Sequence, residues 1–181
     1  MNAFRCSTDS FWLPVYESGG HLEIALTLAT NLPNTLTMNN RSVPTSIVLP
    51  HLVYRSVLDA CDWLGRVFGF TEHYRYGQPV SGIQMYLGGA YIMLTGPRPG
   101  SDSPMNLGSG TQMLTVIVAD VDVHCRKAKR EGATIWEELH ETVYGERQYG
   151  VEDIDGHRWL FSQHARDVDP KEWGATVAAS E

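Results

Sequence analysis

Amphipathic and apolar stretches follow one another along the chain in an order that occurs twice. In the first half, a strand is predicted at SIVLPHLVY, a helix at SVLDACDWLGRVFGF, and three strands at TEHYRYG, GIQMYL and AYIMLTG. In the second half, a strand is predicted at QMLTVIVA, a helix at DVDVHCRKAKREGA, and three strands at TIWEELHE, RQYGVEDI and HRWLFSQH. The sequence therefore predicts an α+β protein of two βαβββ modules, because such self-similarity marks a repeated structural unit.

Capping residues indicate where both predicted helices begin and end. Ser56 can cap the first helix, with Asp59 three residues further on, and Gly69 suits the left-handed position after its last turn. Asp120 can cap the second helix, which Gly132 ends. The first helix is predicted to bury a face with the spacing i, i+4, i+7 and i+11, which carries Val57, Cys61, Leu64 and Phe68.

One segment rich in Pro, Gly and Ser, GPRPGSDSPMNLGSG, is predicted to be the linker between the two modules. The beginning of the chain lacks periodicity, which leaves open whether it folds, and Met38 is a candidate for the native start. Trp173 is the candidate anchor of an otherwise loose C-terminal tail. The predicted boundaries are 1–44 for an N-terminal extension, 45–98 for module one, 99–110 for a linker, 111–166 for module two and 167–181 for the tail.

The segments DWLGRVFGF, VADVDVHCRKAKREGA and VEDIDGHRWLF, placed within two matched halves, resemble the vicinal oxygen chelate superfamily. This superfamily includes glyoxalase I, extradiol dioxygenases and bleomycin-resistance proteins, and the resemblance spans 45–165. It implies a glyoxalase/bleomycin-resistance-type fold in which two curved sheets surround a cavity, and it implies a homodimer. It leaves open whether the modules pair within or between chains. Because one fold hosts many activities, the resemblance predicts the fold and not the reaction.

In the metal-dependent members of that superfamily, His, Glu or Gln ligands come from the first and last strand of each module. Counting from the helix caps and from the Gly of each closing hairpin places the four positions at Leu49, Met93, Met113 and Leu160. None of these side chains offers the N or O donors that Zn²⁺, Fe²⁺, Mn²⁺ or Ni²⁺ prefer. We therefore expect no metal and no cofactor. Ligands from elsewhere would overturn this expectation, the candidates being Gln112, His21, Glu23 and a register-shifted His51.

The closing hairpin of module two is rich in polar residues whose chemistry suits a turn. Asp153 is expected to accept backbone N–H groups and Gly156 to take the positive-φ position, while His157 is expected to face water. A metal site built from Glu152, Asp153, Asp155 and His157 is the less favoured interpretation, because the turn already explains these residues. In the preceding connection, Glu146 and Arg147 are predicted either to pair with each other or to hold a polar ligand group or a dimer contact.

Candidate site residues follow from strand alternation. His51 shares a strand face with Leu49, so it is a candidate acid or base, or else a hydrogen-bonded histidine of the cavity wall. Trp159 and Phe161 are expected to pack on the helix side, opposite to Leu160. The predicted ligand-binding residues are His51, Val53, Met93, Met113, Thr115, Trp136, His140, Arg147, Tyr149, Leu160 and Ser162.

Charge and cysteine content exclude several classes of partner. The net charge of −7 argues against nucleic acid, and the cations around Lys127 suit a helix end. No run is long and apolar enough to predict a membrane span. Three cysteines without a C-x-x-C pair, two of them predicted to be buried, favour a reducing cytoplasm.

These observations favour a metal-independent protein that binds a small molecule in a mostly apolar cavity. The alternatives are a metal-dependent lyase or dioxygenase of the same superfamily, a metal-free enzyme that uses His51 or His140, and a structural dimer whose own side chains fill the pocket. No P-loop, dinucleotide fingerprint or Ser-His-Asp order supports another class of enzyme.

Overall fold

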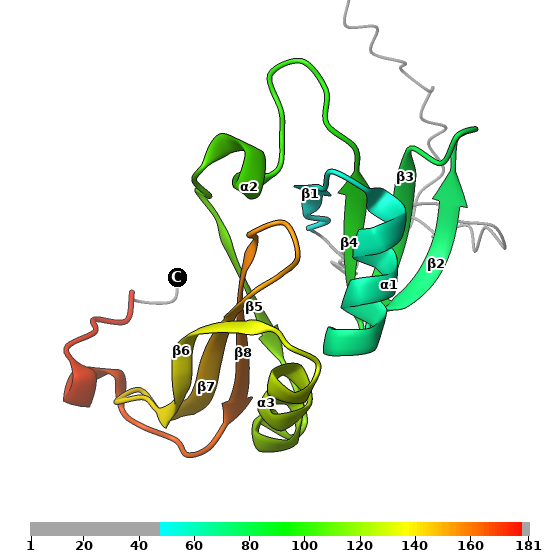
Figure 1. The fold of residues 1–181 in the computed structure, drawn as a ribbon. Coiled ribbons are helices and arrows are strands. Elements are labelled where there is room, and N and C mark those ends of the chain that lie inside the picture. Colours follow the sequence, from blue (N-terminus) through cyan, green and yellow to red (C-terminus); the bar gives the residue numbers. More distant parts are fainter. Residues whose placement is uncertain (1–47, 179–181) are drawn as a thin grey trace, which may run out of the picture. The chain divides into compact units, whose positions relative to one another are not determined.

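The computed structural model describes residues 48–178, which belong to a compact unit of Arg41–Glu181. The predicted N-terminal extension, with Met38, His21 and Glu23, lies outside the described residues. Two modules of one helix and four strands follow each other (Figure 1). Module one consists of β1 (His51–Val53), α1 (Val57–Phe68), β2 (Thr71–Tyr76), β3 (Gly82–Leu87) and β4 (Ala90–Thr95). Module two consists of β5 (Met113–Ile117), α3 (Val121–Arg130), β6 (Thr134–Glu141), β7 (Glu146–Glu152) and β8 (Arg158–His164).

Each module forms its own four-stranded sheet, and the two sheets have the same topology. The strand orders are β1-β4-β3-β2 and β5-β8-β7-β6. The first strand of each module pairs in parallel with the last, and the other pairs are antiparallel. The predicted α+β repeat is therefore confirmed. The register places His51 opposite Met93 in the first sheet and Thr115 opposite Leu160 in the second.

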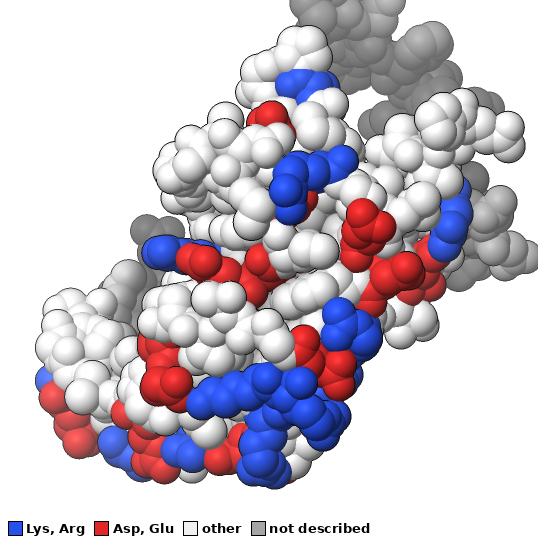
Figure 2. All heavy atoms as spheres, in the orientation of Figure 1, with Lys and Arg blue, Asp and Glu red and all other residues white. Residues whose placement is uncertain are grey.

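The predicted caps position both helices. Ser56 Oγ accepts a hydrogen bond from the N–H of Asp59 at 3.3 Å, and Gly69 follows the helix with φ of 86°. Asp120 Oδ1 accepts from the N–H of Val123 at 2.8 Å. Lys and Arg gather over α3, where three of them occupy the last turn (Figure 2). These cations suit the carbonyl end of the helix, and Lys129 also pairs with Glu138 at 2.5 Å.

The helix sides of both sheets merge into one core. The ring of Phe68 at the end of α1 lies 5.6 Å from that of Trp159 and 4.8 Å from that of Phe161, both on β8. His124 on α3 adds a polar link, because its ring nitrogens reach Tyr149 Oη at 2.7 Å and the Phe68 carbonyl oxygen at 3.1 Å. Burial lowers the pKa of His124, which favours the neutral ring. Within this chain the two modules thus pack through their helix sides.

The segments that join and follow the modules contain more structure than the sequence indicates. The linker includes α2 (Pro104–Leu107), whose first turn is capped by Ser103. The tail includes a 3₁₀ helix (Pro170–Trp173), and the ring of Trp173 packs on Tyr144 at 5.8 Å, as an anchor would. Among the described residues no helix is long and apolar enough to cross a membrane.

Candidate functional site

Strand alternation gives each sheet a second side, which faces away from the helices and which we call the open side. Leu52, Ile83 and Trp159 belong to the shared core, so their neighbours along each strand point to the open side. On the first sheet the open side carries His51, Val53, Tyr74, Gln84, Tyr86, Tyr91, Met93 and Thr95. On the second sheet it carries Met113, Thr115, Ile117, Gln148, Gly150, Leu160 and Ser162.

The open side of the second sheet exposes apolar side chains. Met113 is 48% exposed, Ile117 68% and Trp136 36%. Gly150 makes room for the Trp136 ring, because a Cβ there would lie 2.4 Å from two of its ring atoms. The guanidinium of Arg158 sits 5.5 Å from the centre of the same ring. Arg158 Nε also pairs with Glu152 Oε1 at 3.0 Å, so this side combines apolar surface with an ion pair beside the Trp136 ring.

The open side of the first sheet carries a group of aromatic side chains around His73. A β-bulge between Glu72 and Tyr74 inserts His73 into β2, so that His73 and Tyr74 both reach Gln84 on β3. The ring of His73 lies 5.3 Å from that of Tyr74, 6.3 Å from that of Tyr86 and 5.6 Å from that of Tyr91. We call these residues the His73 cluster: His73, Tyr74, Gln84, Tyr86 and Tyr91.

Sequence reasoning missed the His73 cluster. The alternation of β3 and β4 gives Tyr86 and Tyr91 the same side as Met93, and this signal was available in the sequence. The bulge could not be predicted from the sequence, because it depends on how β2 pairs with β3.

Two cavities lie next to predicted site residues. A cavity of about 500 Å³ is lined by the β3–β4 turn and by the end of β5, including Thr115 and Ile117. A second cavity of about 290 Å³ is lined by His51, Val53, Asp102, Gln112 and His157 together with other linker residues. Thr115 thus belongs to one cavity, while His51 and Val53 belong to the other.

The positions inferred for metal ligands hold side chains that do not fit a hard or borderline metal ion. Leu49 lies just before β1, and the open sides of β4, β5 and β8 carry Met93, Met113 and Leu160. Alkyl and thioether groups do not supply the N or O donors of Zn²⁺, Fe²⁺ or Mn²⁺ sites. Within residues 48–178, no three His, Cys, Asp or Glu side chains are grouped so that they could hold a metal ion.

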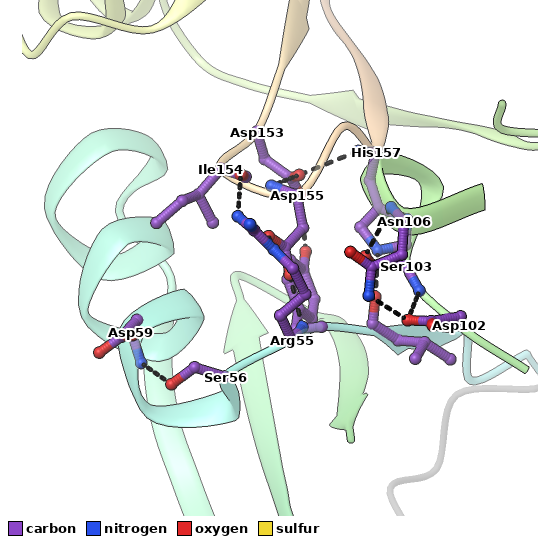
Figure 3. Close-up of polar contacts among 12 residues, drawn as sticks. Arg55, Ser56, Asp59, Asp102, Ser103, Asn106, Asp153, Ile154, Asp155 and His157 are labelled. Atoms are coloured by element: carbon purple, nitrogen blue, oxygen red, sulfur yellow. Dashed lines mark hydrogen bonds and ion pairs between the residues drawn. The ribbon is translucent and has the colours of Figure 1, made fainter. Parts of the chain in front are cut away.

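The closing hairpin of module two forms the predicted turn. Asp153 Oδ1 accepts the N–H groups of Asp155 at 3.0 Å and of His157 at 2.9 Å, and Gly156 has a φ of 82° (Figure 3). Asp153 Oδ2 accepts from the hydroxyl of Tyr54 at 2.6 Å and from Trp159 Nε1 at 3.0 Å. Burial raises the pKa of Asp153, and the donors from Tyr54 and Trp159 oppose that rise. The carboxylate therefore fastens module two to module one.

The same hairpin makes two further contacts with module one. Asp155 accepts from Arg55 Nε and from the Arg55 backbone N–H, each at 2.6 Å (Figure 3). The expectation that His157 faces water is wrong, because this residue is only 4% exposed. Its ring packs on Tyr54 at 4.7 Å, and its Nε2 lies 2.8 Å from the Val53 carbonyl oxygen. Turn chemistry was visible in the sequence, whereas the contact that buries His157 forms only when the modules pack.

Arg147 and Tyr149 lie on the helix side of β7. Arg147 donates through Nε and Nη2 to Asp122 of α3, each at 2.8 Å, so the predicted pair with Glu146 does not form. Tyr149 is fully buried against His124. Both residues therefore point away from the open side.

Two further predicted residues, Ser162 on β8 and His140 on β6, both lie opposite Gln148 of β7. Ser162 donates to Glu146 Oε2 at 2.9 Å. His140 is exposed, and its Nδ1 lies 3.0 Å from the Glu138 carbonyl oxygen.

Comparisons with known proteins agree with this architecture. TioX from Micromonospora sp. ML1 is 33% identical, with a TM-score of 0.57 over 66% of this chain and 98% of its own. TnmS3, an antibiotic binding protein from Streptomyces sp. CB03234, is 18% identical, with a TM-score of 0.56 over 70% of this chain and 100% of its own. An uncharacterized protein of Mycobacterium bovis is 28% identical over 138 residues, which cover 72% of this chain and 91% of the relative.

The family profile described as Glyoxalase/Bleomycin resistance protein/Dioxygenase superfamily matches residues 47–161, which include every strand but the end of β8. The repeated module, the closing hairpin and this match agree with one another. The chain therefore belongs to the Glyoxalase/Bleomycin resistance protein/Dioxygenase superfamily.

Proposed function

We propose that this protein binds a small, mostly apolar molecule in a cavity beside the open sides of its sheets, without the help of a metal ion. The observation that carries the proposal is the cavity of about 500 Å³, which joins the β3–β4 turn to Thr115 and Ile117. Its size lies within the range of ligand pockets, and apolar side chains such as Leu87 and Ile117 dominate its walls. TnmS3, described as an antibiotic binding protein, shares the fold and supports a ligand of this kind by analogy.

The proposal can be tested with Nile red, a neutral dye that fluoresces in apolar surroundings. We expect saturable binding that is unchanged by a chelator, because the inferred ligand positions hold no suitable donors. Thr115→Trp should weaken binding at least fivefold, since the indole would occupy the cavity. Val143→Trp, which changes a side chain that is 70% exposed in the turn after β6, is the matched control. Loss of binding with the chelator, or equal binding by both variants, would contradict the proposal.

We also propose that the chain acts as a homodimer whose partner covers part of the open sides. The exposed Met113, Ile117 and Trp136 give an apolar surface of the kind that interfaces bury. Light scattering should then give about twice the 20.2 kDa mass of one chain. Met113→Glu should weaken the dimer at least tenfold, because it would bury an unpaired charge, and Val177→Glu in the exposed tail should not. A monomer at all concentrations would refute the dimer.

A metal-free reaction that uses His51 is the second candidate function. His51 is exposed on the open side of β1, and it lines the cavity of about 290 Å³ together with Asp102 and His157. An imidazole and a carboxylate on the wall of one cavity are groups of the kind that proton transfer requires. Mass spectrometry of compounds recovered from the protein separates the two candidates. A binding protein returns them unchanged, whereas conversion that disappears in His51→Gln would favour the enzyme.

The free thiols of Cys61 and Cys125 suit the cytoplasmic location that we propose.

A further inference from the structure

We propose that the His73 cluster recognises a planar aromatic group that carries a hydroxyl or another hydrogen-bond donor. This inference rests on the proposed function and assigns the chemical class of the ligand. Stacking on the rings would select flat ligands, and a nitrogen of His73 would select those that can donate a hydrogen bond.

The rings of the cluster form a continuous aromatic surface on the open side of the first sheet. Tyr86 and Tyr91 lie opposite each other on β3 and β4, with their ring centres 5.7 Å apart and the planes tilted by 33°. The ring of His73 touches both, at 6.3 Å and 5.6 Å. Such distances are those of favourable aromatic pairs, and a flat ligand would extend the same contacts.

The position of this surface connects it to the proposed cavity. Tyr86 and Tyr91 stand on the two strands joined by the Leu87–Ala90 turn. That turn lines the cavity of about 500 Å³, whose other wall is the end of β5. A ligand in the cavity would therefore have the aromatic surface as a neighbour on the first sheet.

Hydrogen bonding fixes which nitrogen of His73 is available to a ligand. Nδ1 lies 2.6 Å from Gln84 Oε1, and an amide oxygen can only accept, so Nδ1 carries the proton. Gln84 is fully buried, and its amide nitrogen donates to Tyr74 Oη at 3.3 Å, which holds its oxygen toward His73. In the neutral ring, Nε2 then keeps its lone pair as an acceptor. Because His73 is exposed, this acceptor can serve a hydroxyl of the ligand.

Three related probes separate the two parts of the inference: naphthol, methoxynaphthalene and decahydronaphthol. Calorimetry at about pH 8 should show naphthol binding about three- to tenfold more tightly than methoxynaphthalene. Methoxynaphthalene lacks the donor, so this difference measures the hydrogen bond. Decahydronaphthol keeps the hydroxyl but is not planar, so its weaker binding measures stacking.

Two substitutions locate each preference. His73→Phe keeps an aromatic ring and removes the acceptor, so naphthol and methoxynaphthalene should bind this variant equally. Tyr91→Leu keeps apolar bulk and removes a ring, so the preference for naphthol over decahydronaphthol should fall. His164→Phe changes an exposed histidine at the end of β8, outside the predicted site, and should leave both preferences as they are. Near-ultraviolet circular dichroism of each variant would verify that its fold is retained.

The outcomes distinguish this inference from the proposed function. If Nile red binds but neither preference is seen, or if both persist in the His73 and Tyr91 variants, the inference is wrong and the proposed function stands. If Nile red and all three probes fail to bind, both fall.

Discussion

Replacing Asp153 by alanine is expected to lower the free energy of unfolding by about 3–5 kcal/mol. The carboxylate is 7% exposed and accepts from the Tyr54 hydroxyl, the Trp159 indole and two backbone N–H groups. Tyr54 and Trp159 are fully buried, so alanine would leave both donors without a partner and without access to water. Urea denaturation, followed by tryptophan fluorescence, gives the change in the free energy of unfolding.

Two further variants show whether the loss comes from this network. Tyr54→Phe removes one donor and leaves the others in place, so it should cost about 1 kcal/mol. Asp167→Ala removes a fully exposed carboxylate and should change the free energy of unfolding by less than about 0.5 kcal/mol. If Asp153→Ala costs no more than Asp167→Ala, the carboxylate does not fasten the modules.

Phe68→Ala is expected to destabilise the protein by about 3–5 kcal/mol, because it removes the ring at the junction of both modules. Phe68 is 1% exposed, and its ring contacts those of Trp63 on its own helix and of Trp159 and Phe161 on β8. The cavity left behind would face large rigid rings, which cannot collapse easily into the space. Thermal unfolding, monitored by circular dichroism, measures the effect as a lower midpoint.

Leu58→Ala is the matched control, since Leu58 lies on the same helix and is 43% exposed. It should cost less than about 1 kcal/mol. Similar losses of stability in Phe68→Ala and Leu58→Ala would mean that the buried ring of Phe68 stabilises the protein no more than the exposed side chain of Leu58 does. Two separate unfolding transitions in the wild-type protein would show that the modules do not share one core.

The chain has two distinct surfaces, the helix sides and the open sides of its sheets. The helix sides hold the modules together through Phe68, His124 and Asp153. The open sides carry the exposed Ile117 and the aromatic rings around the exposed His73. We therefore expect stability and the proposed ligand binding to depend on different residues, so that variants such as Asp153→Ala and His73→Phe should separate the two.

Part of this structure could be predicted from the sequence because its causes are local. The Ser56 and Asp120 caps act over three residues, and the turn that starts at Asp153 acts over four. Strand alternation likewise places Leu160 and Phe161 on opposite sides of β8, whatever strands pair with it. The apolar residues at the inferred metal positions are equally a property of the sequence.

Only the tertiary structure decided the contacts between residues far apart in the chain. Asp153 meets Tyr54 across 99 positions, and His157 meets the Val53 carbonyl across 104. Arg147 could pair with its neighbour Glu146, yet strand alternation turned it to the helix side, where Asp122 offers two oxygens. The His73 cluster depends on a bulge in the pairing of β2 with β3. Such contacts form only when modules and strands pack, so no local spacing in the sequence predicts them. The free energy that favours them comes from burying both partners together.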